Sequence, residues 1–487
     1  MTAPRLFALL LLGLLAARLC HVGILWEGGS LPLAAAVQML DGKTLYRDVW
    51  YDKPPLAPAV CLLWGARAGW PLRLAGTLFV LLACYLLYRF ARELWSEREG
   101  MLAAALLAFF LTFGIPAAVI PLAPDLLMVV PHIAAVYLAW RRRPFWSGLA
   151  AGVALLVNTK AVFVLGACLL WGRPLACLAG FAVPVAAAAA WLAAQGSLGA
   201  WYRQVWQLGA LYARHTFLEH PVREGLIRTL NWAGFHAALI LAAAWFWRQD
   251  RAAPRLRLAA WTLLSLAAVT AGWRFFPRYY LALLPVMTLA AARGIRLMGR
   301  WRAVVLLALL VPLARFGPRY VLLAQDLFAG REHAWRDVVM GQDSRAAARL
   351  VLEQARPGDT LFVWGYRPDI FVYTRMPAAT RFLESQPLTG VFADRHLSQS
   401  GSVADELARK NRQELIRHRP TFVLDGLSAF NPKLAMETYA ELRPWLADYR
   451  VVGRTRFTVI YRSSTPAASG EKPPSPPAHP RPARSAS

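Results

Sequence analysis

A group of ionisable residues follows the first hydrophobic segment of the chain. The stretch from Trp26 to Leu56 contains Glu27, directly after that segment, and Lys53, directly before two prolines; it also contains aspartates, of which Asp48 and Asp52 are candidate site residues. A carboxylate can take a proton from an incoming hydroxyl, and a fixed cation can stabilise negative charge on a bound anion. The residue types therefore suit acid–base chemistry beside an anion.

The elements around these residues are those of a membrane protein. Of the 487 residues, 57% are hydrophobic, the formal net charge is +26, and arginines form short clusters between long apolar runs. This distribution argues against nucleic-acid binding and is typical of cytoplasmic loops of an inner-membrane protein. Because a spanning helix needs about 20 apolar residues, fewer where it is buried in protein, we predict about eleven spans. They are placed at 6–25, 71–94, 100–113, 125–140, 146–158, 161–172, 174–194, 233–248, 256–273, 278–295 and 301–318.

The arginine clusters predict the orientation. A cytoplasmic N-terminus places most of the dense arginine clusters of the first two-thirds of the chain in cytoplasmic links. These links hold Arg89 to Arg98, Arg141 to Arg143, Arg173, Arg248 to Arg257 and Arg293 to Arg302. The assignment requires 146–172 to be two short helices joined at an outer tip. If this stretch were one long helix, every later segment would have the opposite orientation in the membrane.

With this orientation the unusual ionisable residues gather outside. They lie in the opening loop, near Asp125, at the tip around Lys160, and in "RFFPRYY" from Arg274 to Tyr280. Charges beside hydrocarbon are costly and are kept where they pair or face a cavity. The pattern predicts an outward-facing site at the membrane surface, although solvated loop charge explains many of these residues individually.

Other classes of site find little support. The five cysteines lie in or beside apolar segments with no CxxC pair and no histidine at metal-ligand spacing, so neither a disulfide framework nor a zinc site is indicated. We therefore predict no metal and no cofactor. The first segment lacks a convincing cleavage site and is interpreted as an uncleaved helix.

The character of the chain changes after residue 320. Alternating short strands and helical periodicity predict a small extracytoplasmic α/β domain at 321–464, following a membrane domain at 1–320. Residues 465–487, rich in proline, serine and alanine, are predicted to be a disordered tail. The fold class is mainly α, a polytopic helical bundle with a small α/β domain.

Several motifs resemble a known family. "LDGKTLYRDVWYDKPPL", "LAPDLLMVVPHIAAVYLAW", "GWRFFPRYYLALLPVMTLAAARG" and "GDTLFVWGYRPDIFVYTRMPAATRF" together resemble the C-type glycosyltransferases, which use polyprenyl-phosphate sugars and include protein O-mannosyltransferases and the lipid A aminoarabinose transferase. The resemblance covers nearly the whole chain except the tail. Where the family commonly has an Asp-Glu pair in the first loop, this chain has Trp26-Glu27.

The resemblance implies roles for the ionisable residues. Glu27 would be the base that deprotonates an acceptor hydroxyl, with Asp125 as a second acid and Asp48 and Asp52 as other first-loop acids. The donor phosphate would be held by basic residues, namely Lys53, Arg274, Arg278 and Lys160. Alternatives stay open: Lys53 can snorkel, Arg274 and Arg278 can anchor the protein at the interface, Lys160 can cap a helix, and Asp125 can be a helix cap.

The resulting hypothesis is a bacterial inner-membrane enzyme with a cytoplasmic N-terminus and an extracytoplasmic C-terminal domain. It would transfer a sugar from a polyprenyl-phosphate carrier to a glycan, lipid or protein acceptor on the outer face; no nucleic acid is involved. The alternative is a non-enzymatic carrier-lipid transporter or assembly scaffold with the same fold.

Overall fold

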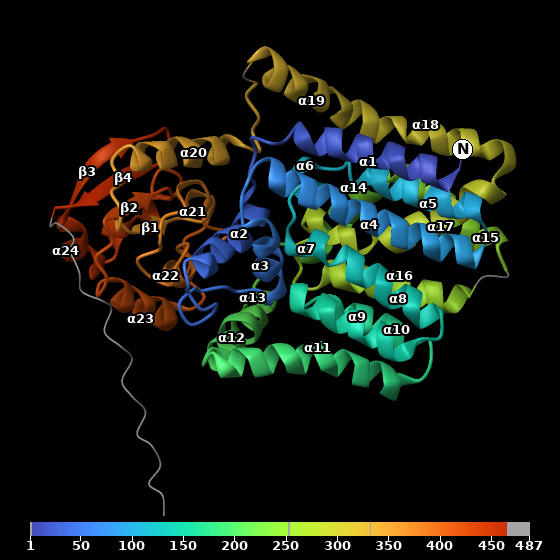
Figure 1. Ribbon diagram of the computed structural model, residues 1–487, viewed down its shortest axis with the longest axis horizontal. Helices are drawn as coiled ribbons and strands as arrows, with labels where there is room; N and C mark the ends of the chain where they lie inside the picture. Colours follow the sequence, from blue (N-terminus) through green and yellow to red (C-terminus); the bar gives the residue numbers. More distant parts are fainter. Residues whose placement is uncertain (1, 252–253, 332, 465–487) are drawn as a thin grey trace, which may run out of the picture.

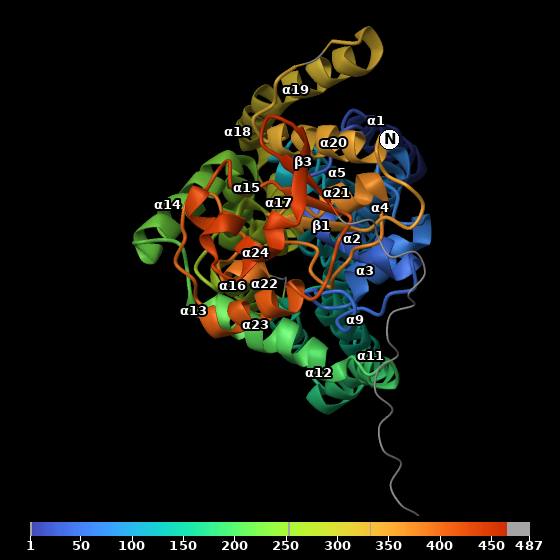
Figure 2. The same ribbon diagram turned by 90° about the vertical axis from the view of Figure 1, so that its left-hand side faces the viewer.

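The computed structural model describes residues 2–251, 254–331 and 333–464. The predicted disordered tail at 465–487 lies outside these residues. A long helical part and a smaller part with a sheet lie side by side along the longest axis (Figure 1). Figure 2 shows the sheet-containing part end-on, in front of the helices.

The first two-thirds of the chain is helical. Its helices are α1 (Ala3–Leu19), α2 (Glu27–Leu40), α3 (Leu56–Cys61), α4 (Trp70–Leu94), α5 (Glu97–Phe110), α6 (Pro116–Val119), α7 (Pro124–Leu127), α8 (Val129–Trp140), α9 (Pro144–Val157), α10 (Ala161–Leu169), α11 (Pro174–Ala194), α12 (Leu198–Trp201), α13 (Leu208–Arg214), α14 (Pro221–Phe235), α15 (Ala237–Gln249), α16 (Arg255–Thr270), α17 (Leu284–Leu297), α18 (Arg302–Ala308) and α19 (Leu310–Ala329). A 3₁₀ segment, η3 (Pro277–Ala282), precedes α17.

Small residues let some of these helices pack backbone to backbone. A Cβ added to Gly148 of α9 would lie 1.8 Å from the Cys177 carbonyl oxygen, and one on Gly180 of α11 would lie 1.9 Å from the Phe145 carbonyl oxygen. No side chain fits at either position. Close approach of this kind is how helices associate in a bilayer, where no hydrophobic force drives them together.

Long apolar helices are present, but fewer than the predicted spans. Within the described residues three helical stretches are long and apolar enough to cross a membrane: Trp70–Leu94, Pro174–Ala194 and Gly299–Ala329. The pair α14 and α15 passes the same test together but bends by 88°. Every predicted span overlaps a helix; α10, with nine residues, is too short to cross alone. The number of spans stays a prediction.

The C-terminal part contains a small mixed sheet. Its elements are α20 (Val339–Leu352), β1 (Leu361–Trp364), α21 (Asp369–Thr374), α22 (Gln386–Thr389), α23 (Asp405–Leu415), β2 (Phe422–Asp425), α24 (Leu442–Ala447), β3 (Tyr449–Arg454) and β4 (Val459–Ser463). The strand order is β1-β2-β4-β3; β1 and β2 are parallel, with Leu361 opposite Phe422, and the other pairs are antiparallel. The predicted α/β character is confirmed. Helix α19 runs through residue 320, and the division into domains stays a prediction.

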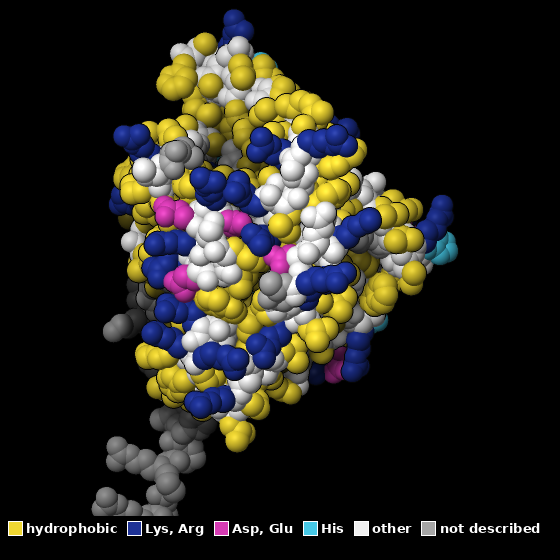
Figure 3. All heavy atoms as spheres, turned by 90° about the vertical axis from the view of Figure 1, so that its right-hand side faces the viewer, with side chains coloured by type: hydrophobic (Ala, Val, Ile, Leu, Met, Phe, Trp, Pro, Cys, Tyr) yellow, Lys and Arg dark blue, Asp and Glu magenta, His cyan; other side chains and the backbone are white. Residues whose placement is uncertain are grey.

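The predicted cytoplasmic links meet at one end of the molecule. Arg293 pairs with Glu99 at 2.8 Å and with Asp250 at 2.8 Å, which joins the links after α4, α15 and α17. Figure 3 shows that lysine and arginine predominate over acidic side chains on this end. This concentration is what the positive-inside rule expects of one side of the membrane.

The orientation can be tested with reporter fusions. We expect alkaline phosphatase fused after residue 330 to be active, because that position would be outside, and a fusion at Arg142 to be inactive, because it would be cytoplasmic. The measurement is phosphatase activity per amount of fusion protein. The reverse pattern would contradict the orientation and the proposed side of the site.

Candidate active site

Glu27 is the first residue of α2, and the chain before it is firmly held. The Trp26 indole donates a hydrogen bond to Asp337 at 3.1 Å, which ties this point to the segment before α20. Arg73 of α4 donates to the carbonyl oxygens of His21 and Ile24. Glu27 is exposed although its neighbours Leu25 and Trp26 are buried. Its carboxylate is therefore carried on a fixed backbone and stays open to a solute.

The start of α2 adjoins an acid and a cation from distant segments. Arg278 of η3 pairs with Asp125 of α7 at 3.4 Å, and Asn158 donates to the other Asp125 oxygen at 3.1 Å. A Cβ on Gly28 would lie 3.5 Å from Nη1 of Arg278, so the guanidinium lies against the first turn of α2. The structure thus brings together three of the predicted site residues: Glu27, Asp125 and Arg278.

Lys160 belongs to the same cluster. Its Nζ lies 2.9 Å from the centre of the Tyr279 ring and has no hydrogen-bond partner in the described part of the chain. Burial lowers the pKa of Lys160 to about 7, an effect that Asp125 partly offsets and Arg278 and Arg274 reinforce. An unsatisfied ammonium beside Asp125 and Arg278 is an arrangement that an anionic ligand would stabilise.

Lys53 sits near the cluster with its neighbouring acid. Its Nζ contacts Asp52 at 2.8 Å, and its carbonyl oxygen accepts a hydrogen bond from Tyr46 at 2.7 Å. Burial acts to lower the pKa of Lys53, but Asp52 and Tyr366 outweigh it and hold the pKa above its usual value. Lys53 is therefore a permanent cation.

Asp48 lies apart from this cluster. Its carboxylate pairs with Arg47 at 2.9 Å and accepts the backbone N–H of Thr44 at 2.9 Å, and both charged side chains are well exposed. These contacts close a surface turn. The contacts of the Asp48 side chain are therefore made within its own loop.

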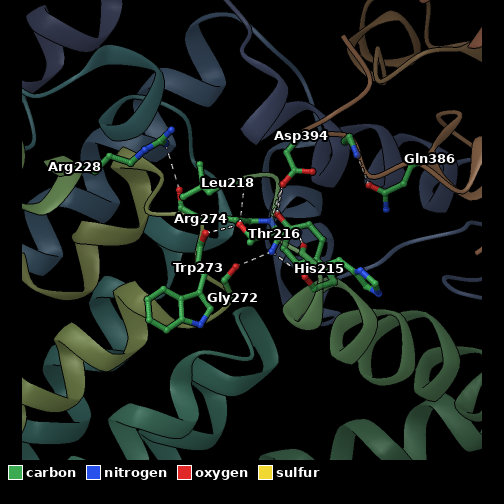
Figure 4. A network of polar contacts seen from close by, with 11 residues as sticks. His215, Thr216, Leu218, Arg228, Gly272, Trp273, Arg274, Gln386 and Asp394 are labelled. Atoms are coloured by element: carbon green, nitrogen blue, oxygen red, sulfur yellow. Dashed lines mark hydrogen bonds and ion pairs between the residues drawn. The ribbon is translucent and has the colours of Figure 1, made fainter. Parts of the chain in front are cut away.

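Arg274 is placed differently from the phosphate-binding role suggested by the sequence. It is fully buried; Nε contacts Asp394 at 2.6 Å, and the terminal nitrogens donate to the carbonyl oxygens of Tyr212, Gly272 and His215. Figure 4 shows this network joining the loop after α13, the loop before η3 and the C-terminal part. With its nitrogens occupied in this way, Arg274 positions the loop that carries Arg278.

Further ionisable residues come from the C-terminal part. Tyr366 lies within electrostatic reach of Lys53 and Arg278, and Asp369, the first residue of α21, within reach of Glu27. Glu384 is buried near Asp52 and Lys53. The motif "GYRPD" contains two of these residues, but only the packing of α21 on α2 shows that they face the first loop.

The environment of Glu27 favours a base that titrates near neutrality. Desolvation by the surrounding protein and the nearby Asp369 raise the pKa of Glu27 to about 7, while Arg367 and Arg278 act in the opposite direction. A general base works best with a pKa near the operating pH. Among the described residues, no group of three or more histidines, cysteines or acids is placed to hold a metal ion.

Comparisons with known proteins concern the family and the fold of the chain. Residues 52–194 match the family described as dolichyl-phosphate-mannose-protein mannosyltransferase. The fold is similar to that of ArnT from Cupriavidus metallidurans bound to undecaprenyl phosphate, with a TM-score of 0.59 at 15% identity over 96% of this chain and 99% of that one. The chain has the C-type glycosyltransferase fold. The resemblance inferred from the sequence is thereby confirmed.

Other comparisons are more distant. The apo structure of the same ArnT has a TM-score of 0.52 at 15% identity, covering 94% of this chain and 98% of that one. An apo oligosaccharyltransferase from Archaeoglobus fulgidus has a TM-score of 0.47 at 14% identity, covering 91% and 71%. No curated protein matches the chain. The likeness of fold therefore rests on the two ArnT structures, whose TM-scores are 0.59 and 0.52.

Proposed function

We propose that this protein transfers a sugar from a polyprenyl-phosphate carrier to an acceptor on the outer face of the bacterial inner membrane. One observation supports this most: Arg278 forms an ion pair with Asp125 beside the first turn of α2, and Glu27 is the first residue of that helix. A base, a second acid and several cations from distant segments meet there. The fold supplies the family context, and the site supplies the chemistry.

Glu27 takes the proton of the acceptor hydroxyl in this proposal. The hydroxyl oxygen forms a bond to the anomeric carbon, the bond from that carbon to the phosphate oxygen breaks, and the electron pair stays on the phosphate. The leaving phosphate needs no general acid, because it is stable as an anion. Asp125 keeps Arg278 in place and accepts a hydrogen bond from Asn158.

The cations act on the phosphate. As the carrier bond breaks, the phosphate gains negative charge, and Lys53, Arg278 and Lys160 stabilise that charge more than the ground state. Asp52 orients Lys53 through their 2.8 Å contact. Arg274 takes part indirectly, by holding the loop before η3.

An apolar cavity next to Arg278 suits the carrier's hydrocarbon chain. It has a volume of about 670 Å³ and is lined by residues of α14, α19 and η3, among them Pro277, Tyr280 and Phe316. Pro277 directly precedes Arg278 in the chain. An isoprenoid in this cavity would bring its phosphate to the basic cluster.

The carrier assignment predicts a binding defect. We expect Lys53→Ala and Arg278→Ala each to weaken binding of undecaprenyl phosphate to the purified protein by about tenfold or more, because each removes a charge-assisted contact. Arg47→Ala, which removes an exposed arginine of the same loop, is the matched control. If both test variants bind undecaprenyl phosphate as well as the unaltered protein does, Lys53 and Arg278 do not bind the carrier and serve only as anchors at the membrane interface.

The pH dependence of transfer provides a second check on Glu27. Because the base must be deprotonated, we expect kcat/KM to rise with pH until about 7, the pKa of Glu27, and then to level off. Asp369→Asn removes a like charge, so the inflection should move to lower pH. Asp41→Asn, in the exposed first loop, should leave it in place. A profile independent of Glu27 and Asp369 would exclude this base.

The overall function is tested in cells. Mass spectrometry of envelope glycans, lipids and glycoproteins from a deletion strain should show loss of one sugar modification, restored by the intact gene and not by Glu27→Gln at equal membrane abundance. Restoration by Glu27→Gln would favour the alternative, a carrier-lipid transporter or scaffold. The same comparison identifies the sugar and the acceptor.

A further inference from the structure

A second cavity, distinct from the one lined by α14, α19 and η3, lies beside the segment that precedes Glu27. It has a volume of about 590 Å³ and is lined by residues that follow α1, residues that precede α4 and one face of α20. Helix α20 lies in the C-terminal part, beside the helical part (Figure 1). The cavity's lining includes Ile24 and Leu25, which come just before Glu27, but none of the ionisable residues of the candidate active site. Helix α20 approaches closely here, since a Cβ on Gly341 would lie 2.9 Å from the carbonyl oxygen of Leu25.

The two walls of this cavity differ in polarity. One wall is apolar and is formed by Val22, Ile24, Leu25 and Ala68, next to the ends of α1 and α4. The other wall is formed by α20 and by Tyr373, and it carries charged side chains. A ligand that fills the cavity needs an apolar end and a charged end.

The charged residues of the second wall are evenly spaced along the chain. Arg345, Arg349 and Glu353 all line the cavity and follow one another at intervals of four residues. Residues four apart lie on the same helix face, about 6 Å apart along the axis. The wall therefore presents two positive charges and then a negative one, each about one turn further along.

Arg345 is held in place, whereas the next two groups are available. Arg345 donates to the carbonyl oxygen of Gly23, and its guanidinium carbon lies 5.3 Å from the centre of the Tyr373 ring. Within the described residues, no hydrogen bond or ion pair engages the side chains of Arg349 or Glu353, and both residues are exposed.

Exposed apolar side chains lie close in sequence to Ala68 and Gly69 of the cavity's lining. Trp70, the first residue of α4, is 65% exposed, and Leu63, shortly before it, is 83% exposed. Large apolar side chains this exposed beside the end of a long apolar helix suit contact with lipid, and tryptophan favours the interface. We infer that a bilayer surface lies beside the opening, so a lipid molecule can reach the cavity.

We propose that this cavity binds one membrane phospholipid with a phosphoethanolamine headgroup. The phosphate would lie between Arg345 and Arg349, the ammonium would reach Glu353, and the start of the acyl chains would cover the apolar wall. A purely anionic headgroup leaves Glu353 facing negative charge. A choline headgroup offers no N–H to the carboxylate. The zwitterion with a primary ammonium satisfies all three charges.

The test is lipid binding to the full chain, independent of any transfer activity. The detergent-solubilised protein is mixed with equal amounts of dioleoylphosphatidylethanolamine, dioleoylphosphatidylcholine and dioleoylphosphatidylglycerol, and bound lipid is counted by native mass spectrometry. We expect phosphatidylethanolamine to be retained at least about fivefold over each of the others, as one charge-assisted hydrogen bond allows.

Variants of α20 test the contributions of Arg349 and Glu353 one at a time. Arg349→Gln should lower phosphatidylethanolamine binding about tenfold. Glu353→Gln should abolish the preference over phosphatidylglycerol. Arg356→Gln, which removes an exposed arginine that does not line the cavity, is the charge-matched control and should change neither. Equal retention of the three lipids, a preference for phosphatidylglycerol in the unaltered protein, or an equal loss in Arg356→Gln would overturn the proposal.

Discussion

Glu27→Gln is expected to lower sugar transfer about a thousandfold while leaving the protein folded in the membrane, since a positioned general base contributes on the order of 10²- to 10⁴-fold. The Glu27 side chain is exposed, so the substitution removes no packing contact. Its backbone is held by neighbouring contacts of Trp26 and Arg73, which the substitution does not touch. The measurement is the rate of sugar transfer by the purified protein. The sugar donor for this assay is the one identified by mass spectrometry of the deletion strain.

Matched variants make this result specific. Glu27→Asp keeps the carboxylate but withdraws it by about one methylene, and errors of position of this size can cost about a hundredfold, so intermediate activity is expected. Asp41→Asn neutralises another exposed acid of the same loop and should be nearly silent. Full activity of Glu27→Gln would refute the assignment and direct attention to Asp52, Asp125 and Asp369.

The second large effect concerns Arg274. Arg274→Met should destabilise the protein by about 3–5 kcal/mol, because it leaves Asp394 as an uncompensated buried charge. Asp394 is buried, and one of its oxygens already lacks a partner in the described structure. The measurement is thermal or denaturant unfolding of the purified protein in detergent.

A double variant separates this role from binding of the carrier. Because Asp394→Asn removes the unpaired charge, adding it to Arg274→Met should recover part of the lost stability. If Arg274 instead held the donor phosphate, the single variant would unfold normally and lose undecaprenyl phosphate binding. Arg278→Ala, whose side chain is more exposed, should show that second pattern.

The candidate site was predicted unevenly from the sequence. The sequence predicts Glu27, Asp125, Lys160 and Arg278 as site residues because they are charges beside apolar segments, and the structure places them together. Asp48 and Arg274 look the same in sequence, but one closes an exposed turn and the other is buried against Asp394. A sequence gives the type of each residue and its spacing from others. These two properties do not show whether a charged side chain faces a cavity or is paired with another charge inside the fold.

The sequence by itself determined the helical membrane character, the alternating apolar segments and the α/β nature of the C-terminal part, because these follow from local composition and periodicity. The tertiary structure alone decided that α21 packs on α2, so that Asp369 faces Glu27, and that Tyr366 and Glu384 approach Lys53. These pairs are more than 300 residues apart in the chain. Their proximity, and the surroundings that raise the pKa of Glu27, arise only when these distant segments pack together.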